Sequence, residues 1–217
     1  GEIVLETFGK PCHSANPEKG INAVYKMAKV IEAIRTLEPT HHPVLGDGIL
    51  ELTDIKSAPY PGASVVPEYC RATYDRRLLV GETKESVLAP IQALLDKLMA
   101  EDPQLKAKVS YAVGKEQCYT GNEITGERFF PGWLYDEKDA FVQDVKKELE
   151  GMGYTPEITQ YNFCTNGSHY AGEAGIKTFG LGPSKENLAH TVNEYIEIDQ
   201  LTKVTDCYYG VMKALLK

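Results

Sequence analysis

The first half of the chain alternates between strand-like and helix-like patterns of apolar residues. Residues 2–7 alternate in polarity, which is typical of a strand with one buried face. Asn16-Pro17 then reads as an N-cap followed by a proline in the first helical turn. Apolar residues recur at helical spacing from there to about Leu37, and Pro39 ends the pattern. These residues predict a strand, a short loop and a long amphipathic helix.

The pattern continues with two more strands, a second helix and a fourth strand. Strand-like runs cover residues 49–55, 69–80 and 108–113, and Thr83 caps a helix with one apolar face before the last of them. The order β-α-β-β-α-β over residues 1–116 is the split βαβ, or ferredoxin-like, arrangement. We therefore expect an α/β (α+β) domain in which two helices cover one face of a four-stranded antiparallel sheet.

Residues 117–217 predict a second, smaller set of elements. A Gly- and Pro-rich stretch at residues 117–135 looks like a connection. Periodicity then predicts a helix from Asp136 or Asp139 to Gly151, strands at Thr159–Phe163 and Thr178–Leu181, and a last helix capped by Asp199. A sheet of two or three strands cannot bury both of its faces well, so we expect further strands to come from elsewhere.

The start of the chain supports the same expectation. Gly1 opens directly into an alternating strand, without an initiator Met or an N-terminal tail. A tag scar or processing would give the same start. We expect residues 1–116 to be one domain, and residues 117–217 to be the C-terminal portion of another domain whose N-terminal portion is absent.

Composition narrows the function classes. Hydrophobic residues make up 42% and charged residues 25% of the chain, as in ordinary globular proteins. The net charge of −8 gives no electrostatic footprint for nucleic acid or an anionic membrane. The five cysteines are widely spaced and form no C-x-x-C pair, which favours separate thiols in a reducing cytoplasm.

Residue types suited to catalysis are few. None of the five histidines belongs to a complete metal-ligand motif, and there is no G-x-S-x-G elbow or P-loop. Three combinations stand out. Residues 9–24 place His13 in a tight loop between a strand and a helix, and residues 63–67 precede a strand that carries Asp75-Arg76-Arg77. Residues 182–198 contain a Gly-Pro turn, then His190, then an acid four residues later.

At these residues the chain resembles the zinc-dependent amidohydrolase and peptidase family of acetylornithine deacetylase, succinyl-diaminopimelate desuccinylase, aminoacylase and glutamate carboxypeptidase. The G-x-x-x-H-S-x-x-P-x-x-G-x-N-A segment resembles the start of the family's lid domain. The V-P segment followed by D-x-R resembles its third lid strand, and A-H-x-x-x-E resembles its last metal-ligand loop. The resemblance covers essentially the whole chain, but only the second half of such a protein. It implies that residues 1–116 are the lid, or dimerisation, domain.

The resemblance also implies roles for individual residues. His190 matches the last metal ligand, although a surface-loop histidine capped by Glu194 is the simpler alternative. His13 matches a lid histidine that reaches the partner subunit's active site and stabilises an oxyanion. Arg77 matches an arginine that pairs with a substrate carboxylate. Arg76 is its rival, one residue away on the opposite face of the strand.

Four further positions match substrate-binding residues of the family less closely. Ser64 stands where many members have Asn, and Asn166 stands where many have an acid, so both departures put the usual substrates in doubt. Thr165 keeps the hydroxyl of that turn, which is as well explained by a purely structural turn. Gly182 would let the backbone approach a ligand closely, or is a plain turn glycine.

We therefore expect a fragment of a cytoplasmic metal-dependent amidohydrolase that acts on N-acyl amino acids or small peptides. The resemblance implies two zinc ions in each full-length subunit, with cobalt or manganese as alternatives, and a homodimer formed through the lid domain. The family's other metal ligands and its general base belong to the half that is absent here, so we expect this chain alone to be inactive. The alternatives are a non-catalytic dimerisation or small-molecule-binding module, and one subunit of a two-chain enzyme.

Overall fold

The computed structural model describes residues 1–216 and divides into two compact units. Unit 1 comprises Gly1–Gly132 and unit 2 comprises Trp133–Lys217. The division falls later than the boundary expected at residue 116, because residues 113–127 form a hairpin that continues unit 1. Each unit is described by itself.

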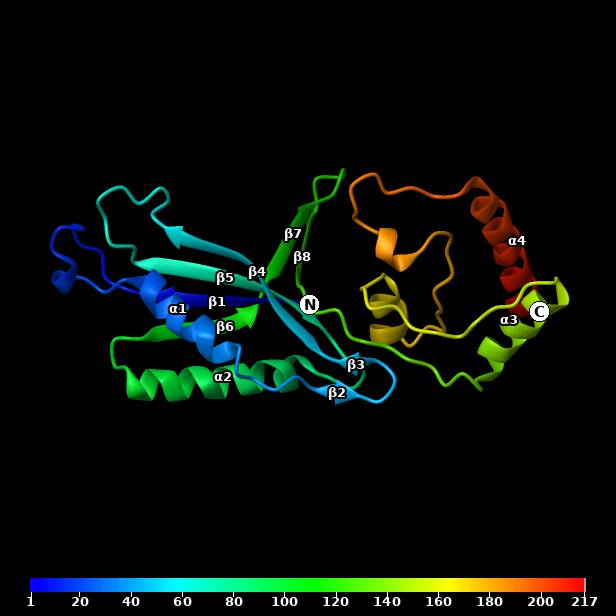
Figure 1. Cartoon of the computed structure of the whole chain (residues 1–217), viewed down its shortest axis with the longest axis horizontal. Coiled ribbons are helices and arrows are strands. Elements are labelled where there is room, and N and C mark those ends of the chain that lie inside the picture. Colours follow the sequence, from blue (N-terminus) through cyan, green and yellow to red (C-terminus); the bar gives the residue numbers. More distant parts are fainter. Residues whose placement is uncertain (217) are drawn as a thin grey trace. The chain divides into compact units, whose positions relative to one another are not determined.

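Unit 1 is built on a four-stranded antiparallel sheet with the order β4-β5-β1-β6 (Figure 1). Two helices complete the expected β-α-β-β-α-β order. The elements are β1 (Glu2–Phe8), α1 (Ala23–Ile34), β4 (Ile49–Ala58), β5 (Tyr69–Arg77), α2 (Lys84–Glu101) and β6 (Lys106–Tyr111). The ferredoxin-like arrangement predicted from the apolar pattern is therefore present.

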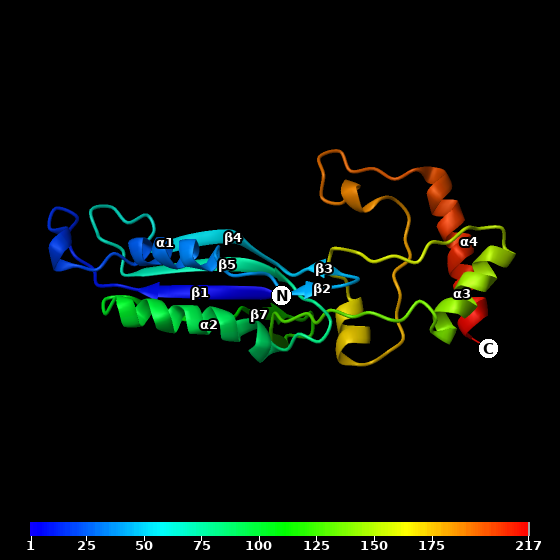
Figure 2. The ribbon, with the colours of Figure 1, turned by 60° about the horizontal axis from the view of Figure 1, so that its bottom comes forward.

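Both helices cover the same face of this sheet (Figure 2). Alternate residues of β1, such as Ile3 and Leu5, are fully buried against Met27 of α1 and Leu95 of α2. The opposite face of the sheet carries charged side chains at many positions, including Glu6, because successive side chains of a strand point to opposite faces. Every second side chain of the strands thus packs against one apolar face of each helix, and this packing forms the core of unit 1.

The first helix starts later than the sequence predicted. Pro17–Lys19 form one 3-10 turn, and α1 begins at Ala23. Its N-cap is Asn22, whose side chain accepts hydrogen bonds from the main-chain N–H groups of Val24 and Tyr25. Asn16 makes no side-chain cap of this kind. The prediction of a helix start at Asn16 is therefore wrong, since a second capping residue lies six positions further on.

The second helix starts where the sequence predicted. Thr83 and Ser86 form a reciprocal capping box at its N-terminus. Its C-cap, Asp102, accepts a 2.9 Å hydrogen bond from Lys26 of α1. This bond lowers the pKa of the Asp102 carboxyl. The ion pair thereby fastens the end of one helix to the side of the other.

Two small hairpins extend unit 1. The pair β2 (His41–His42) and β3 (Gly46–Asp47) follows α1, and the pair β7 (Val113–Gln117) and β8 (Glu123–Glu127) follows β6. Residues 117–135, expected to be a plain connection, thus include one strand of a regular hairpin. The strand expected to run to Val80 ends instead at Arg77.

Unit 2 contains two packed helices and long irregular segments. The helices α3 (Ala140–Gly151) and α4 (Ile198–Leu215) bury Leu149 against Cys207. Between them lie two short helical turns, η2 (Ser168–Glu173) and η3 (Glu186–Leu188). The N-cap of α3 is Asp139, one of the two residues predicted, whereas that of α4 is Glu197 rather than Asp199.

The strands predicted in unit 2 are absent from the described residues. Residues 159–163 and 178–181 adopt no regular structure. A strand needs a partner for its N–H and C=O groups, and neither segment has a strand partner among residues 1–216. Many large apolar side chains of unit 2 are also exposed, including Val192 at 92% and Ile198 at 82%. Unit 2 therefore does not bury a complete core by itself.

No helix among residues 1–216 combines the length and the apolar character needed to span a bilayer.

The buried hydroxyl of Tyr74 allows a test of how the core of unit 1 is packed. Among the described residues it has no hydrogen-bond partner, and the Tyr74 side chain lies in the core. We expect Tyr74→Phe to raise the free energy of unfolding at neutral pH by about 1 kcal/mol, because it removes an unpaired buried polar group. Urea denaturation measures the change. A loss of stability would show that the hydroxyl has a partner.

Tyr74 should also affect the stability of unit 1 at alkaline pH. Burial raises the pKa of Tyr74 to about 12, and it does the same for Tyr111. Unfolded tyrosines ionise near pH ~10, so above that pH the unfolded state loses protons that the folded state keeps. Stability is therefore full below pH ~10 and falls as the pH rises towards ~12. Urea denaturation across this range should show a shallower fall for Tyr74→Phe than for the unaltered chain.

Candidate functional site

The loop that carries His13 is joined to the loop that carries Ser64. The N–H of Ser14 donates to the carbonyl oxygen of Ser64 at 2.9 Å, and the N–H of Val66 donates to the carbonyl oxygen of Cys12 at 2.8 Å. In Figure 1 these are the dark blue and cyan loops at the end of unit 1 that lies at the left. Two positions far apart in the sequence, each predicted as a site residue, thus lie side by side.

The local geometry of both residues is well defined. The exposed His13 ring accepts the Ala15 N–H at its Nδ1 atom, at 3.0 Å. Ser64 has a φ of 59°, in the left-handed region that Asn adopts more readily than Ser. Ser64 therefore holds this backbone shape at some conformational cost.

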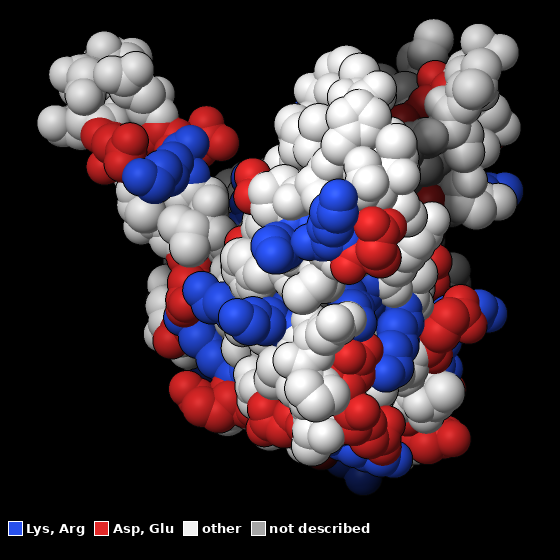
Figure 3. All heavy atoms as spheres, turned by 90° about the vertical axis from the view of Figure 1, so that its left-hand side faces the viewer, with Lys and Arg blue, Asp and Glu red and all other residues white. Residues whose placement is uncertain are grey.

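The loop end of unit 1 carries charges of both signs. Viewed from this side, Lys and Arg side chains are interspersed with Asp and Glu (Figure 3). Long-range steering needs a field of one sign. The surface seen in this view therefore presents no such field of one sign.

The two candidate arginines have different surroundings. Arg76 is 7% exposed, and its guanidinium donates to the Glu82 carboxylate and, at 3.1 Å, to the Thr40 hydroxyl. This buried ion pair is structural. Arg77 lies on the other face of β5, where its side chain is 38% exposed and pairs with Asp75 at 2.7 Å. Of the two, Arg77 is the residue that a ligand can reach.

Arg77 and His13 lie at opposite ends of the same sheet. Phe8 pairs with Tyr69 at the end where the His13 and Ser64 loops emerge, and Glu2 pairs with Asp75 at the other end. A strand rises by about 3.3 Å per residue, so the two ends of β5 are roughly 25 Å apart. Within unit 1 the structure therefore brings His13 and Ser64 together but keeps Arg77 away from them.

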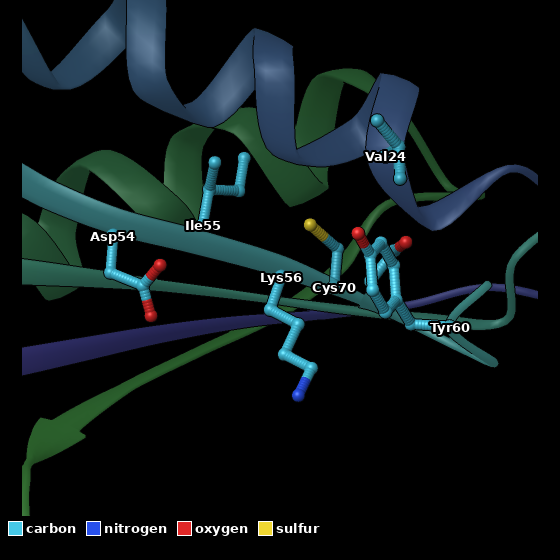
Figure 4. Close-up of a pocket in the computed structure, with 7 residues that line it drawn as sticks. Val24, Asp54, Ile55, Lys56, Tyr60 and Cys70 are labelled. Atoms are coloured by element: carbon cyan, nitrogen blue, oxygen red, sulfur yellow. The ribbon is translucent and has the colours of Figure 1, made fainter.

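A groove that the sequence analysis did not predict lies between α1 and the edge strand β4. Its volume is about 370 Å³, and it is lined by Val24, Asp54, Ile55, Lys56, Ser57, Tyr60 and Cys70. Ile55 and Cys70 point to the helix side of the sheet, and Asp54 and Lys56 point away from it (Figure 4). Burial raises the pKa of the Cys70 thiol. Two apolar residues that line this groove are exposed, Ile55 at 48% and Tyr60 at 74%.

In unit 2, His190 lies in an exposed loop with a left-handed backbone. Its φ is 60°, and its N–H donates to the Glu194 carboxylate at 3.0 Å. The acid four residues later therefore fixes the loop through the main chain of His190 and leaves the imidazole unused by this bond.

Thr165 and Asn166 shape a turn before η2. The Thr165 hydroxyl accepts the Gly167 N–H at 3.1 Å, and the Asn166 carbonyl oxygen accepts the His169 N–H at 3.0 Å. Both residues therefore have a structural role in the turn. At Gly182 a Cβ atom would meet open space, so the described chain gives no steric reason for glycine there.

Residues 1–216 contain no group of three or more His, Cys, Asp or Glu side chains placed to hold a metal ion. At the predicted metal site the described chain offers the imidazole of His190, in an incomplete ligand set. One imidazole in an open loop fits a ligand set that other residues complete, since zinc sites use at least three protein ligands.

Comparison with known proteins connects these observations. Residues 1–103 match the model of the peptidase dimerisation domain, M20_dimer. The uncharacterized protein YgeY of Escherichia coli K12 is 33% identical over 196 residues, which are 89% of this chain and 47% of that protein. N-formyl-4-amino-5-aminomethyl-2-methylpyrimidine deformylase of Halalkalibacterium halodurans is 28% identical over 89% of this chain and 46% of its own length. The chain spans about half the length of these curated relatives.

A solved structure shows the same fold. Aminopeptidase PepT of Bacillus cereus superposes with a TM-score of 0.68 and 20% identity, over 100% of this chain and 52% of that one. At this identity the likeness concerns the fold alone. The match to the family model, by itself, places residues 1–103 among the M20 peptidase dimerisation domains.

Proposed function

We propose that this chain is part of a metal-dependent amidohydrolase that removes an acyl group from N-acyl amino acids or cleaves small peptides. The observation that carries the proposal is the division of candidate residues between the two ends of one sheet. His13 and Ser64 are held together at one end, and Arg77 lies at the other. A single copy cannot bring them to one substrate, so the arrangement fits a site shared between two copies.

Pairing along β4 would bring the two ends together. A two-fold axis perpendicular to the sheet pairs an edge strand with its own copy in antiparallel fashion. The loop end of one copy then lies on the same side as the Arg77 end of the other. Of the two edge strands, β4 is longer than β6, at ten residues against six, and it borders the groove with the exposed Ile55. We therefore assign the homodimer interface to β4 and α1.

Unit 2 supplies the second argument. Its exposed apolar side chains and its irregular segments need further strands to cover them. In an M20 hydrolase these would come from the rest of the catalytic domain. The deformylase relative, by its name, releases a formyl group from nitrogen. This supports hydrolysis of an N-acyl amide as the reaction class for this chain.

Each candidate residue then has a defined task. His190 would hold zinc, or cobalt or manganese in its place, together with ligands from the rest of the full-length protein. When bound, the two metal ions supply Lewis-acid activation of the amide. His13 donates a hydrogen bond to the oxygen that becomes negative, and Arg77 pairs with the substrate carboxylate. Ser64 would contact the ligand beside His13. Thr165, Asn166 and Gly182 would be the substrate contacts that unit 2 contributes.

Two histidine variants of the full-length protein separate the roles of His13 and His190. We expect His13→Ala to lower kcat by about 100- to 1000-fold, the effect of removing one oxyanion donor, with metal content unchanged. We expect His190→Ala to lose bound metal together with activity. Steady-state kinetics and metal analysis of the same samples measure both. Loss of metal in His13→Ala, or full metal content in His190→Ala, would reverse the assignments.

A parent protein with no hydrolase activity on any N-acyl amino acid or small peptide would contradict the proposed reaction. The non-catalytic dimerisation module would then be the better description.

The interface assignment can be tested on the chain itself. We expect Ile55→Glu to convert the dimer to monomers, because a charge on β4 would be buried when two copies meet. Ile124→Glu is the matched control, since Ile124 is an exposed isoleucine of β8, outside the β4 edge. Sedimentation velocity at several concentrations measures both. A dimeric Ile55→Glu chain, or a monomeric Ile124→Glu chain, would contradict the assignment.

A further inference from the structure

The ring of His13 is held by a main-chain group two residues further on. The Ala15 N–H lies 3.0 Å from the Nδ1 atom of His13. An amide N–H can only donate, so Nδ1 must present its lone pair. A neutral imidazole carries one proton, which is then on Nε2. We infer that the Ala15 N–H fixes His13 as the neutral tautomer protonated at Nε2, so that the loop presents a hydrogen-bond donor to its ligand.

The loop holds this arrangement through its own main-chain bonds. The N–H of Asn16 donates to the carbonyl oxygen of His13 at 2.9 Å and closes the turn in which Ala15 lies. The bond from the Ser14 N–H to the carbonyl oxygen of Ser64, also 2.9 Å, ties the same turn to the neighbouring loop. The amide of Ala15 is therefore fixed in place before any ligand arrives, and it acts as a positioning group for the ring.

The tautomer decides which ligands His13 can take. A neutral ring protonated at Nε2 offers an N–H to a carbonyl, carboxylate or oxyanion oxygen. It offers no lone pair at Nε2 to a metal ion or to an acidic proton, because its one lone pair, at Nδ1, already accepts the Ala15 N–H. This inference rests on the proposed function for the identity of the oxygen. The tautomer itself follows from the geometry of the loop alone.

Three other histidines provide internal controls. The Nδ1 atom of His42 accepts the N–H groups of Val44 and Leu45, both at 3.1 Å, so its neutral ring should also be protonated at Nε2. In His41 and His169 the Nδ1 atom faces a carboxylate instead, Asp47 at 2.6 Å and Glu173 at 2.8 Å. A carboxylate accepts, so these two rings should carry the proton on Nδ1.

Nitrogen NMR of the ¹⁵N-histidine-labelled chain tests the inference without any assay of activity. The spectrum is recorded at about pH 8.5, where an ordinary imidazole is neutral. We expect His13 and His42 to show a protonated-type Nε2 and an unprotonated-type Nδ1, and His41 and His169 to show the reverse. Substitution of each histidine by Gln assigns the signals. A protonated-type Nδ1 in His13, or averaging of its two nitrogens, would overturn the inference whatever the protein catalyses.

Two side-chain replacements in the full-length protein test the donor role. The Asn oxygen of His13→Asn can accept the Ala15 N–H as Nδ1 does, because an Asx turn has the same spacing. It places no donor at the position of Nε2. The longer amide of His13→Gln does place an N–H near that position. We expect His13→Gln to keep at least about tenfold more kcat than His13→Asn at equal metal content. Equal kcat values, or more activity in His13→Asn, would contradict the donor role while leaving the NMR result intact.

Discussion

The antiparallel pairing of β1 with β5 is the constraint on which the rest of unit 1 depends. Its register runs from Glu2 opposite Asp75 to Phe8 opposite Tyr69. The loop after β1 and the loop before β5 must therefore emerge at the same end of the sheet, where their backbones bond to each other. The same register places Arg77 at the far end. One set of strand hydrogen bonds thus decides which candidate residues can meet.

The alternation of side chains across a strand gives neighbouring residues of β5 separate tasks. Arg76 points to the helix side, where the Glu82 carboxylate and the Thr40 hydroxyl satisfy its guanidinium. Arg77 points to the uncovered face and remains half-exposed beside Asp75. A buried charge left without its partner is strongly destabilising. Arg76 must therefore keep its contacts with Glu82 and Thr40. The residue next to it is free of that restriction and can serve recognition.

In unit 2, the described segments between the helices lack the partners that the strands of unit 1 have. Its two helices bury a small cluster around Leu149 and Cys207, but the segments between them have no strand partners among the described residues. The exposed side chains around Ile198 form apolar surface, whose contact with water is unfavourable. The chain spans about half the length of the curated relatives it matches.

The sequence alone determined the elements of unit 1, because periods of two and of about 3.6 residues report which side of a strand or helix is buried. It also located the cap at Thr83 and the loop of His13, which depend on neighbouring residues. The start of α1 at Ala23 was missed, since Asn16 and Asn22 both suit an N-cap and packing decides between them. Only the tertiary structure decided that His13 meets Ser64, that Arg76 is buried and that the predicted strands of unit 2 do not form. Each of these depends on partners distant in the chain, which a local pattern does not encode.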